Sequence, residues 1–152
     1  MLLQLTPDAV TNSWDELSEE IQKALSDKER SQAVMNNLLN ELLLQRASCW
    51  ISYDDQDDNS VNGCLVLSVH YDEFNHEKNL NVFALVKNSK FIGLQTTMRM
   101  YQEGIAGLRK YMQANGFRKL TGFVDTDKKR HVKTLEAAGF KFQYHIEMDI
   151  GD

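Results

Sequence analysis

Two similar stretches near the C-terminal end decide the fold: "LRKYMQANGFRKL" (Leu108–Leu120) and "HVKTLEAAGFKF" (His131–Phe142). In each stretch, apolar residues at helical spacing run up to a glycine, and a phenylalanine and a basic residue follow it. Glycine is common just past the end of a helix because it adopts the left-handed conformation at no steric cost. We therefore predict a positive φ at Gly116 and Gly139. After each glycine, we expect the phenylalanine to fold back onto the core as a strand begins.

Size and composition indicate a single domain spanning residues 1–152, with 42% hydrophobic residues available for a core. The net charge of −5 argues against binding to nucleic acid or anionic membranes, because both need clustered positive charge. Cys49 and Cys64 lie in apolar runs without a CxxC partner, so we expect buried free thiols. The start has no signal-peptide pattern, and no apolar stretch approaches the roughly 20 residues that span a bilayer. We expect a soluble protein made inside the cell.

Hydrophobic periodicity predicts a short strand at Met1–Leu5 and then two helices. Ser13 and Glu16 have the spacing of a capping box, which would start the first helix. The period changes at Ser48, where strands replace helices. The loops that follow are too short for crossovers, so we predict an antiparallel meander of three strands. Their sequences are "SCWISY", "CLVLSVHYDEF" and "LNVFALV".

A long helix is predicted from about Thr96 to Asn115, followed by a strand, a helix and a final alternating strand at Phe140–Ile150. Gly104 and Gly107 lie inside the long helix, where each costs up to about 1 kcal/mol relative to alanine. Interior glycines usually indicate close packing against a sheet, and less often the approach of a ligand. The predicted order of elements is β-α-α-β-β-β-α-β-α-β, a mixed α/β (α+β) chain.

This order resembles the GCN5-related N-acetyltransferase (GNAT) superfamily, and within it the small GNAT-like proteins of tailed bacteriophages. The resemblance rests on an early tryptophan in "SWDEL", on a helix that runs into a Cys-Trp strand in "NNLLNELLLQRASCWIS", and on the two helix-Gly-Phe junctions. It covers nearly the whole chain as an ordering of elements. It implies a GNAT-like mixed sheet with helices on both faces, and an acetyl-CoA-dependent transfer of an acyl group to an amine.

The resemblance also implies where acetyl-CoA binds: in a cleft between two parallel strands, with backbone amides before the long helix holding the pyrophosphate. The family writes this loop as Q/R-x-x-G-x-G/A, and the matching stretch is near "QTTMRM". Met98 and Met100 stand there where the family has small residues. The positions implied for the cofactor are Leu85, Val86, Ser89, Gln95 and Thr96.

For catalysis, the resemblance implies a tyrosine acid four residues before the last helix's glycine, but this chain has Leu135 there. Glu73, in the segment "HYDEF", and His131 are candidates for a general base. No metal site is expected, because the acidic run Asp54–Asp58 lacks the glycine and distal glutamate of a calcium loop. These departures leave a second interpretation open: a phage virion or assembly protein that keeps the fold and contacts other phage proteins. The expected location is the cytoplasm of the host cell or the virion.

Overall fold

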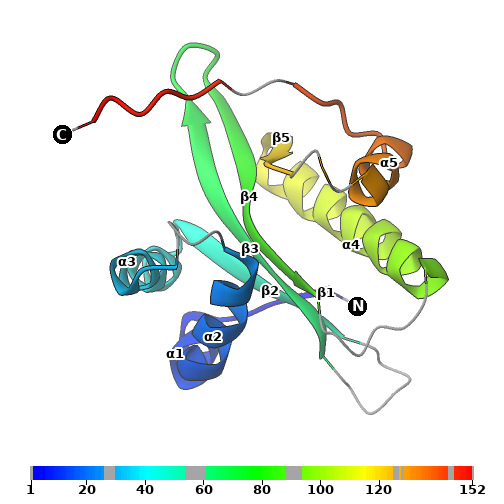
Figure 1. Cartoon of the computed structure of the whole chain (residues 1–152). Coiled ribbons are helices and arrows are strands. Elements are labelled where there is room, and N and C mark those ends of the chain that lie inside the picture. The colour runs from blue at the N-terminus through cyan, green and yellow to red at the C-terminus, as the bar shows by residue number, and fades with distance from the viewer. Residues whose placement is uncertain are drawn as a thin grey trace.

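The computed structural model describes residues 2–25, 30–53, 61–87, 94–124, 127, 129–143 and 146–151; for residues 87, 94–101 and 131 it describes the backbone alone. Helices and strands follow the chain in nearly the predicted order (Figure 1). They are β1 (Leu2–Gln4), α1 (Pro7–Asn12), α2 (Trp14–Ala24), α3 (Gln32–Leu43), β2 (Ala47–Tyr53), β3 (Val61–Asp72), β4 (Glu77–Lys87), α4 (Leu94–Asn115), β5 (Phe117–Gly122) and α5 (Lys129–Ala137).

The described strands form one sheet in the order β1-β2-β3-β4-β5. Neighbouring strands are antiparallel from β1 to β4, which confirms the predicted meander. The last pair, β4 and β5, is parallel, with a register from Lys78 opposite Phe117 to Val82 opposite Gly122. A parallel neighbour needs a crossover connection, and α4 provides it.

Helices cover both faces of this sheet, as predicted (Figure 1). One face carries α1, α2 and α3, whose Val10, Ile21 and Met35 are fully buried in a core with Cys49 and Val66 of the sheet. The other face carries α4 and α5. None of the described helices is both long enough and apolar enough to cross a membrane.

The core under α4 is built around aromatic rings and three buried leucines, Leu67, Leu80 and Leu108. The ring of Trp50 meets Tyr111 edge to face at 4.8 Å, and Tyr111 stacks on Phe117 at 5.8 Å, measured between centroids. The Lys78 ammonium lies 4.5 Å from the centre of the Phe117 ring. The first helix-Gly-Phe junction therefore does what the sequence predicts: its phenylalanine folds back onto the helix it follows.

Both junction glycines have positive φ, +73° at Gly116 and +96° at Gly139, as predicted. At the end of α5 the chain forms a Schellman motif. The Phe140 N–H donates to the Leu135 carbonyl at 3.0 Å, and the Gly139 N–H donates to the Glu136 carbonyl at 3.0 Å. These two bonds satisfy carbonyls that the end of a helix otherwise leaves without partners.

The predicted capping box is wrong. Ser13 ends α1 as well as starting α2, and its side chain makes no capping hydrogen bond. The sequence interpretation missed α1, which begins with Pro7 at its first position. Thr6 caps this short helix, accepting a hydrogen bond from the Ala9 N–H at 3.2 Å. Because α1 runs directly into α2, Ser13 does not have the extended backbone that a capping side chain needs.

The predicted final strand is absent from the described parts of its segment, residues 140–143 and 146–150. Alternating Ile146, Met148 and Ile150 are 92%, 84% and 90% exposed. Alternation identifies a segment whose side chains suit a strand. A strand forms only where its backbone pairs with the edge of a neighbouring strand. This pairing depends on the tertiary structure, which the local sequence pattern does not reveal.

Candidate functional site

Strand β4 continues beyond its pairing with β5. The last pair joins Val82 to Gly122, whereas Phe83–Lys87 has β3 on one side and no described strand on the other. Gly122 permits this close final contact, because a Cβ there would lie 3.2 Å from Cβ of Val82. Alternate residues of a strand turn their N–H and C=O groups to opposite sides. The end of β4 therefore offers backbone donors and acceptors where β5 departs.

A bulge in β4 lies at this point of divergence. Val66 pairs with Ala84, but the next residue of β3, Leu67, pairs with Val82, so Phe83 is the extra residue. A bulge bends its strand and increases the local twist. The bend begins where the pairing with β5 ends, and we attribute the separation of the two strands to it.

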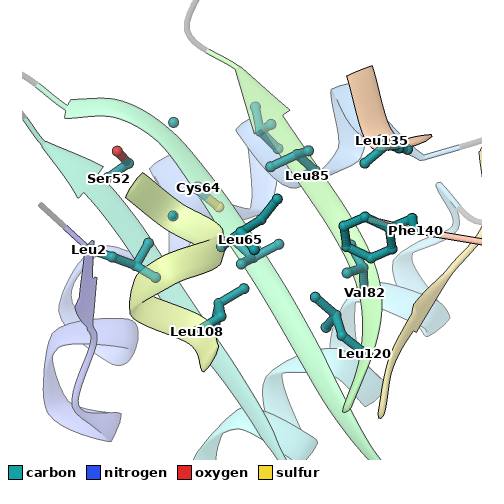
Figure 2. A pocket seen from close by; sticks show the side chains of 14 residues that line it. Leu2, Ser52, Cys64, Leu65, Val82, Leu85, Leu108, Leu120, Leu135 and Phe140 are labelled. Carbon is teal, nitrogen blue, oxygen red and sulfur yellow. The ribbon is translucent and has the colours of Figure 1, made fainter. Parts of the chain in front are cut away.

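An apolar cavity of about 150 Å³ lies beside this divergence (Figure 2). It is bounded by the sheet, by α4, and by α5 with the residue that follows its terminal glycine. The exposed fraction of Leu85, 47%, marks the side on which the cavity opens to solvent. The lining residues are Leu2, Ser52, Gly63, Cys64, Leu65, Val82, Leu85, Val86, Gly104, Ile105, Leu108, Leu120, Leu135 and Phe140.

The α4 wall of the cavity depends on a glycine. Gly104 lies one turn before Leu108, on the same face of the helix, and both line the cavity. A Cβ added at Gly104 would meet no neighbouring atom within 4 Å. At Gly107, by contrast, the added Cβ would lie 3.7 Å from Leu2 of β1. The two glycines thus differ: Gly107 packs against the sheet, and Gly104 borders open space.

The Schellman motif forms the opposite wall. This motif commonly brings the residue after the glycine into contact with the residue at the start of the helix's last turn. Here those residues are Phe140 and Leu135, and both line the cavity (Figure 2). The helix-Gly-Phe junction therefore shapes the site as well as ending the helix. Leu135 also occupies the position that the family resemblance assigns to a tyrosine acid, so this wall is apolar there.

The described residues that line the cavity include few groups that could transfer a proton. Among the described lining residues, Ser52 has the only hydroxyl, and none is a carboxylate, histidine, lysine or arginine. A hydrogen bond with Cys49, together with burial, raises the pKa of the Cys64 thiol, so it stays neutral and unreactive near pH 7. Both cysteines are free and buried, as predicted. The arrangement is suited to binding and positioning an apolar group.

The structure brings some of the predicted cofactor residues together. Leu85 and Val86 both line the cavity. Gln95 and Thr96 are the second and third residues of α4, where backbone N–H groups have no acceptor within the helix. Such groups, with the helix dipole, favour anions. Ser89 lies outside the described residues.

The two methionines that match the family's loop motif lie within helix α4. Helix α4 begins at Leu94, earlier than the predicted start at Thr96, so Met98 and Met100 lie in its second turn. Backbone N–H groups there bond to carbonyls one turn earlier. The methionines therefore do not occupy the positions whose amides are free for a phosphate. Their side chains, and the acidic run Asp54–Asp58, lie outside what the structure describes.

The two candidate bases lie in different parts of the molecule. Glu73 is in the turn before β4, and the eight residue steps from Glu77 to Leu85 span roughly 26 Å along the strand. Glu73 is therefore not brought to the cavity, because the hairpin extends away from it. His131 lies in α5, one turn before the cavity residue Leu135. The placement of its side chain is outside the described part of the chain.

The residues that sequence reasoning missed are the apolar walls, above all Ile105, Leu120 and Phe140. Their sequence signal is that of ordinary core residues, since a cavity wall and a packed core have the same apolar pattern. Gly104 was the one available signal, because an interior helical glycine is unusual.

No protein-family model matches the sequence, and no curated protein matches it. Solved structures do match over the whole chain. A probable acetyltransferase is 12% identical with a TM-score of 0.74, covering 100% of this chain and 99% of its own. The aminoglycoside acetyltransferase AAC(6')-Iy, in complex with a bisubstrate analog, CoA-S-monomethyl-acetylneamine, is 12% identical with a TM-score of 0.71, covering 100% and 97%.

A third match is the ribosomal-protein-alanine N-acetyltransferase from Brucella melitensis biovar Abortus 2308. It is 11% identical with a TM-score of 0.65, and the match covers 98% of each chain. At these identities the likeness concerns the fold. The chain has the fold of these acetyltransferases, as the resemblance to the GNAT superfamily implied.

Proposed function

We propose that this chain is an acyl-CoA-dependent N-acyltransferase, which moves an acyl group from the thioester sulfur of CoA to the nitrogen of an amine. One arrangement carries the proposal: β4 separates from β5 beside an apolar cavity, and the chain after β4 continues to the N-terminus of the long helix α4. An extended thioester with a phosphate-bearing end needs these three features together. Acetyltransferases that share the fold support the same assignment, one of them crystallised with a CoA-derived analog.

The described residues fit such a substrate at both ends. The backbone of Leu85 and Val86 lies in the unpaired end of β4, where the amides of the pantetheine arm would pair as a strand does. The N–H groups of Gln95 and Thr96 would hold the pyrophosphate, helped by the positive end of the helix dipole. Ser89 would lie between these two ends along the chain.

In the proposed reaction, the amine nitrogen forms a bond to the acyl carbon, the carbon–sulfur bond breaks, and the sulfur leaves with the electron pair and takes up a proton. The cavity contributes position and the exclusion of water, which account for a large part of many such rate enhancements. The proton lost by the amine needs an acceptor, and we propose His131 for that role because it lies one turn before Leu135 in α5. The departing sulfur would take its proton from solvent.

Binding of acetyl-CoA, measured by calorimetry and by the rise in unfolding temperature, tests the proposal. A ligand that binds only the folded state must stabilise it by mass action. The variant Gln95→Pro removes one N–H from the first turn, where no helical hydrogen bond is lost. We expect it to weaken binding by about tenfold or more, the strength of a hydrogen bond to a charged group. Gln95→Ala keeps the N–H and is the matched control.

The expected result is micromolar binding in the native chain, retained in Gln95→Ala and weakened by about tenfold or more in Gln95→Pro, with equal unfolding temperatures for the unliganded variants. If neither acetyl-CoA nor a longer acyl-CoA binds at millimolar concentration, the proposed function is wrong. Equal binding of acetyl-CoA by both variants would show that the N-terminus of α4 is not part of the site.

The second candidate is a non-enzymatic virion or assembly protein of a tailed bacteriophage, acting in the host cytoplasm or in the particle. The exposed apolar side chains of Ile146, Met148 and Ile150 favour it, because clustered apolar surface commonly marks protein contacts. Leu135, in place of a tyrosine acid, also favours it. The acetyl-CoA titration distinguishes the two candidate functions. Absence of acetyl-CoA binding, together with co-purification in phage particles, supports the structural role.

A further inference from the structure

We infer that the acyl group handled at this site is apolar and longer than acetyl, extending to about six carbons; the inference rests on the proposed acyl-CoA function. Three properties of the cavity lead to it: its volume, the chemistry of its walls, and the absence of a side chain at Gly104.

The volume is too large for the acyl group of acetyl-CoA. The cavity measures about 150 Å³. An apolar protein cavity of about that volume binds benzene, a ligand of six carbons. The methyl group of an acetyl would leave most of this space without contacts, and unfilled apolar space forfeits dispersion attraction from every wall atom that faces it. A chain of about six carbons would restore those contacts.

The walls select for apolar acyl groups. Leu65, Val82, Leu120, Leu135 and Phe140 surround the space (Figure 2). Among the described lining residues, none carries a charge that would pair with a carboxylate. Burying an unpaired charge is strongly unfavourable. Acyl groups that end in a carboxylate, such as succinyl, should therefore bind more weakly than unsubstituted acyl groups of the same length.

The cavity is also in the right place to receive a chain from the thioester. Its open side is at Leu85, which lies in the unpaired end of β4 proposed to hold the pantetheine arm. Gly104 lies on the α4 side, and a Cβ there would meet nothing within 4 Å. A side chain at that position would project into space that is otherwise empty. Position 104 therefore controls how much room the acyl chain has.

The experiment measures the affinities of CoA, acetyl-CoA, butyryl-CoA, hexanoyl-CoA, dodecanoyl-CoA and succinyl-CoA by calorimetry on the full chain. Each methylene moved from water into an apolar site should tighten binding about fourfold. We expect hexanoyl-CoA to bind on the order of 100-fold more tightly than acetyl-CoA. Dodecanoyl-CoA should gain nothing further, since its chain outgrows the cavity. Succinyl-CoA should bind no better than acetyl-CoA.

Variants at position 104 connect this preference to the cavity. Gly104→Leu should remove the advantage of hexanoyl-CoA while leaving the affinity of CoA itself unchanged. Ala106→Leu adds a leucine to the exposed side of the same helix and is the matched control. Gly104→Ala should fold at least as stably as the native chain, because alanine favours a helix interior, and should reduce the hexanoyl preference in part.

The outcomes distinguish a failure of the acyl-length inference from a failure of the proposed acyl-CoA function. If CoA and acetyl-CoA bind but hexanoyl-CoA binds no better than acetyl-CoA, the acyl-length inference is wrong and the proposed function stands. A hexanoyl preference that survives both substitutions at Gly104 would also overturn it, because another surface would then hold the chain. If neither CoA nor any of its thioesters binds, the proposed function itself fails.

Discussion

Replacing Gly139 by alanine tests the feature that both ends α5 and forms one wall of the cavity. The glycine has φ +96°, and an added Cβ would have Arg109 Nη2 as its nearest neighbour at 4.0 Å, so no steric clash is expected. The effect should come from the backbone. A left-handed conformation costs an L-residue roughly 1–2 kcal/mol, and alanine recovers about 0.4–1 kcal/mol by restricting the unfolded chain. The net loss of stability should be about 1 kcal/mol.

Urea denaturation of Gly139→Ala and Gly139→Asn, compared with the native chain, measures this loss. For a domain of this size, about 1 kcal/mol lowers the midpoint of thermal unfolding by roughly 2–4 °C. Asparagine tolerates left-handed backbone better than alanine, so Gly139→Asn should be the more stable of the two variants. Alanine at or above native stability, or no advantage for asparagine, would refute the assignment of a left-handed cap at this junction.

Three further predictions concern the site and its surroundings. Leu135→Tyr should raise the rate of acyl transfer about tenfold or more above Leu135→Phe, measured as release of CoA thiol, because its hydroxyl can protonate the departing sulfur. A thiol-reactive dye should modify neither Cys49 nor Cys64 in the native chain, and both after denaturation, because both are buried. Hydrogen bonds from Asn75 lower the pKa of Asp72, whose carboxylate therefore stabilises the fold above the ordinary aspartate pKa. The stability difference between the native chain and Asp72→Ala, measured by urea denaturation, should shrink as pH falls below about 4.

The sequence predicts the order of the elements well because hydrophobic periodicity and the residues that end helices or form turns are local signals. The meander, the long crossover helix and the two glycine caps all depend on residues within one or two turns of each other. The errors occur where the same local sequence pattern is compatible with two different structures. Ser13 has the spacing of a capping box, but α1 before it removes the backbone conformation that such a cap requires. The alternation at Phe140–Ile150 suits a strand, yet the described part of that segment forms none.

The site is harder to predict than the fold because its shape depends on backbone events that are distant in sequence. The bulge at Phe83 is visible only when the registers of β3 and β4 are compared. The walls are ordinary leucines and phenylalanines that a periodicity argument assigns to the core. The resemblance to a family implies Leu85 and Val86, whereas the low helical propensity of glycine singles out Gly104 and allows two explanations, packing against a sheet or the approach of a ligand. The structure distinguishes Gly107, which lies against Leu2, from Gly104, which borders open space.

In the proposed function, binding and turnover depend on different parts of the site. Holding a thioester would depend on backbone features: the unpaired end of β4, the first turn of α4 and the space beside Gly104. A sequence can drift far while keeping the fold, as matches at 9–16% identity with full-length coverage illustrate. Proton transfer depends instead on single side chains, and this chain has Leu135 at the position where the family resemblance implies a tyrosine acid. A chain of this fold could therefore bind acyl-CoA tightly and turn it over slowly. Comparing affinity with rate in Leu135→Tyr and Leu135→Phe separates the two properties, since the added hydroxyl should change the rate far more than the affinity.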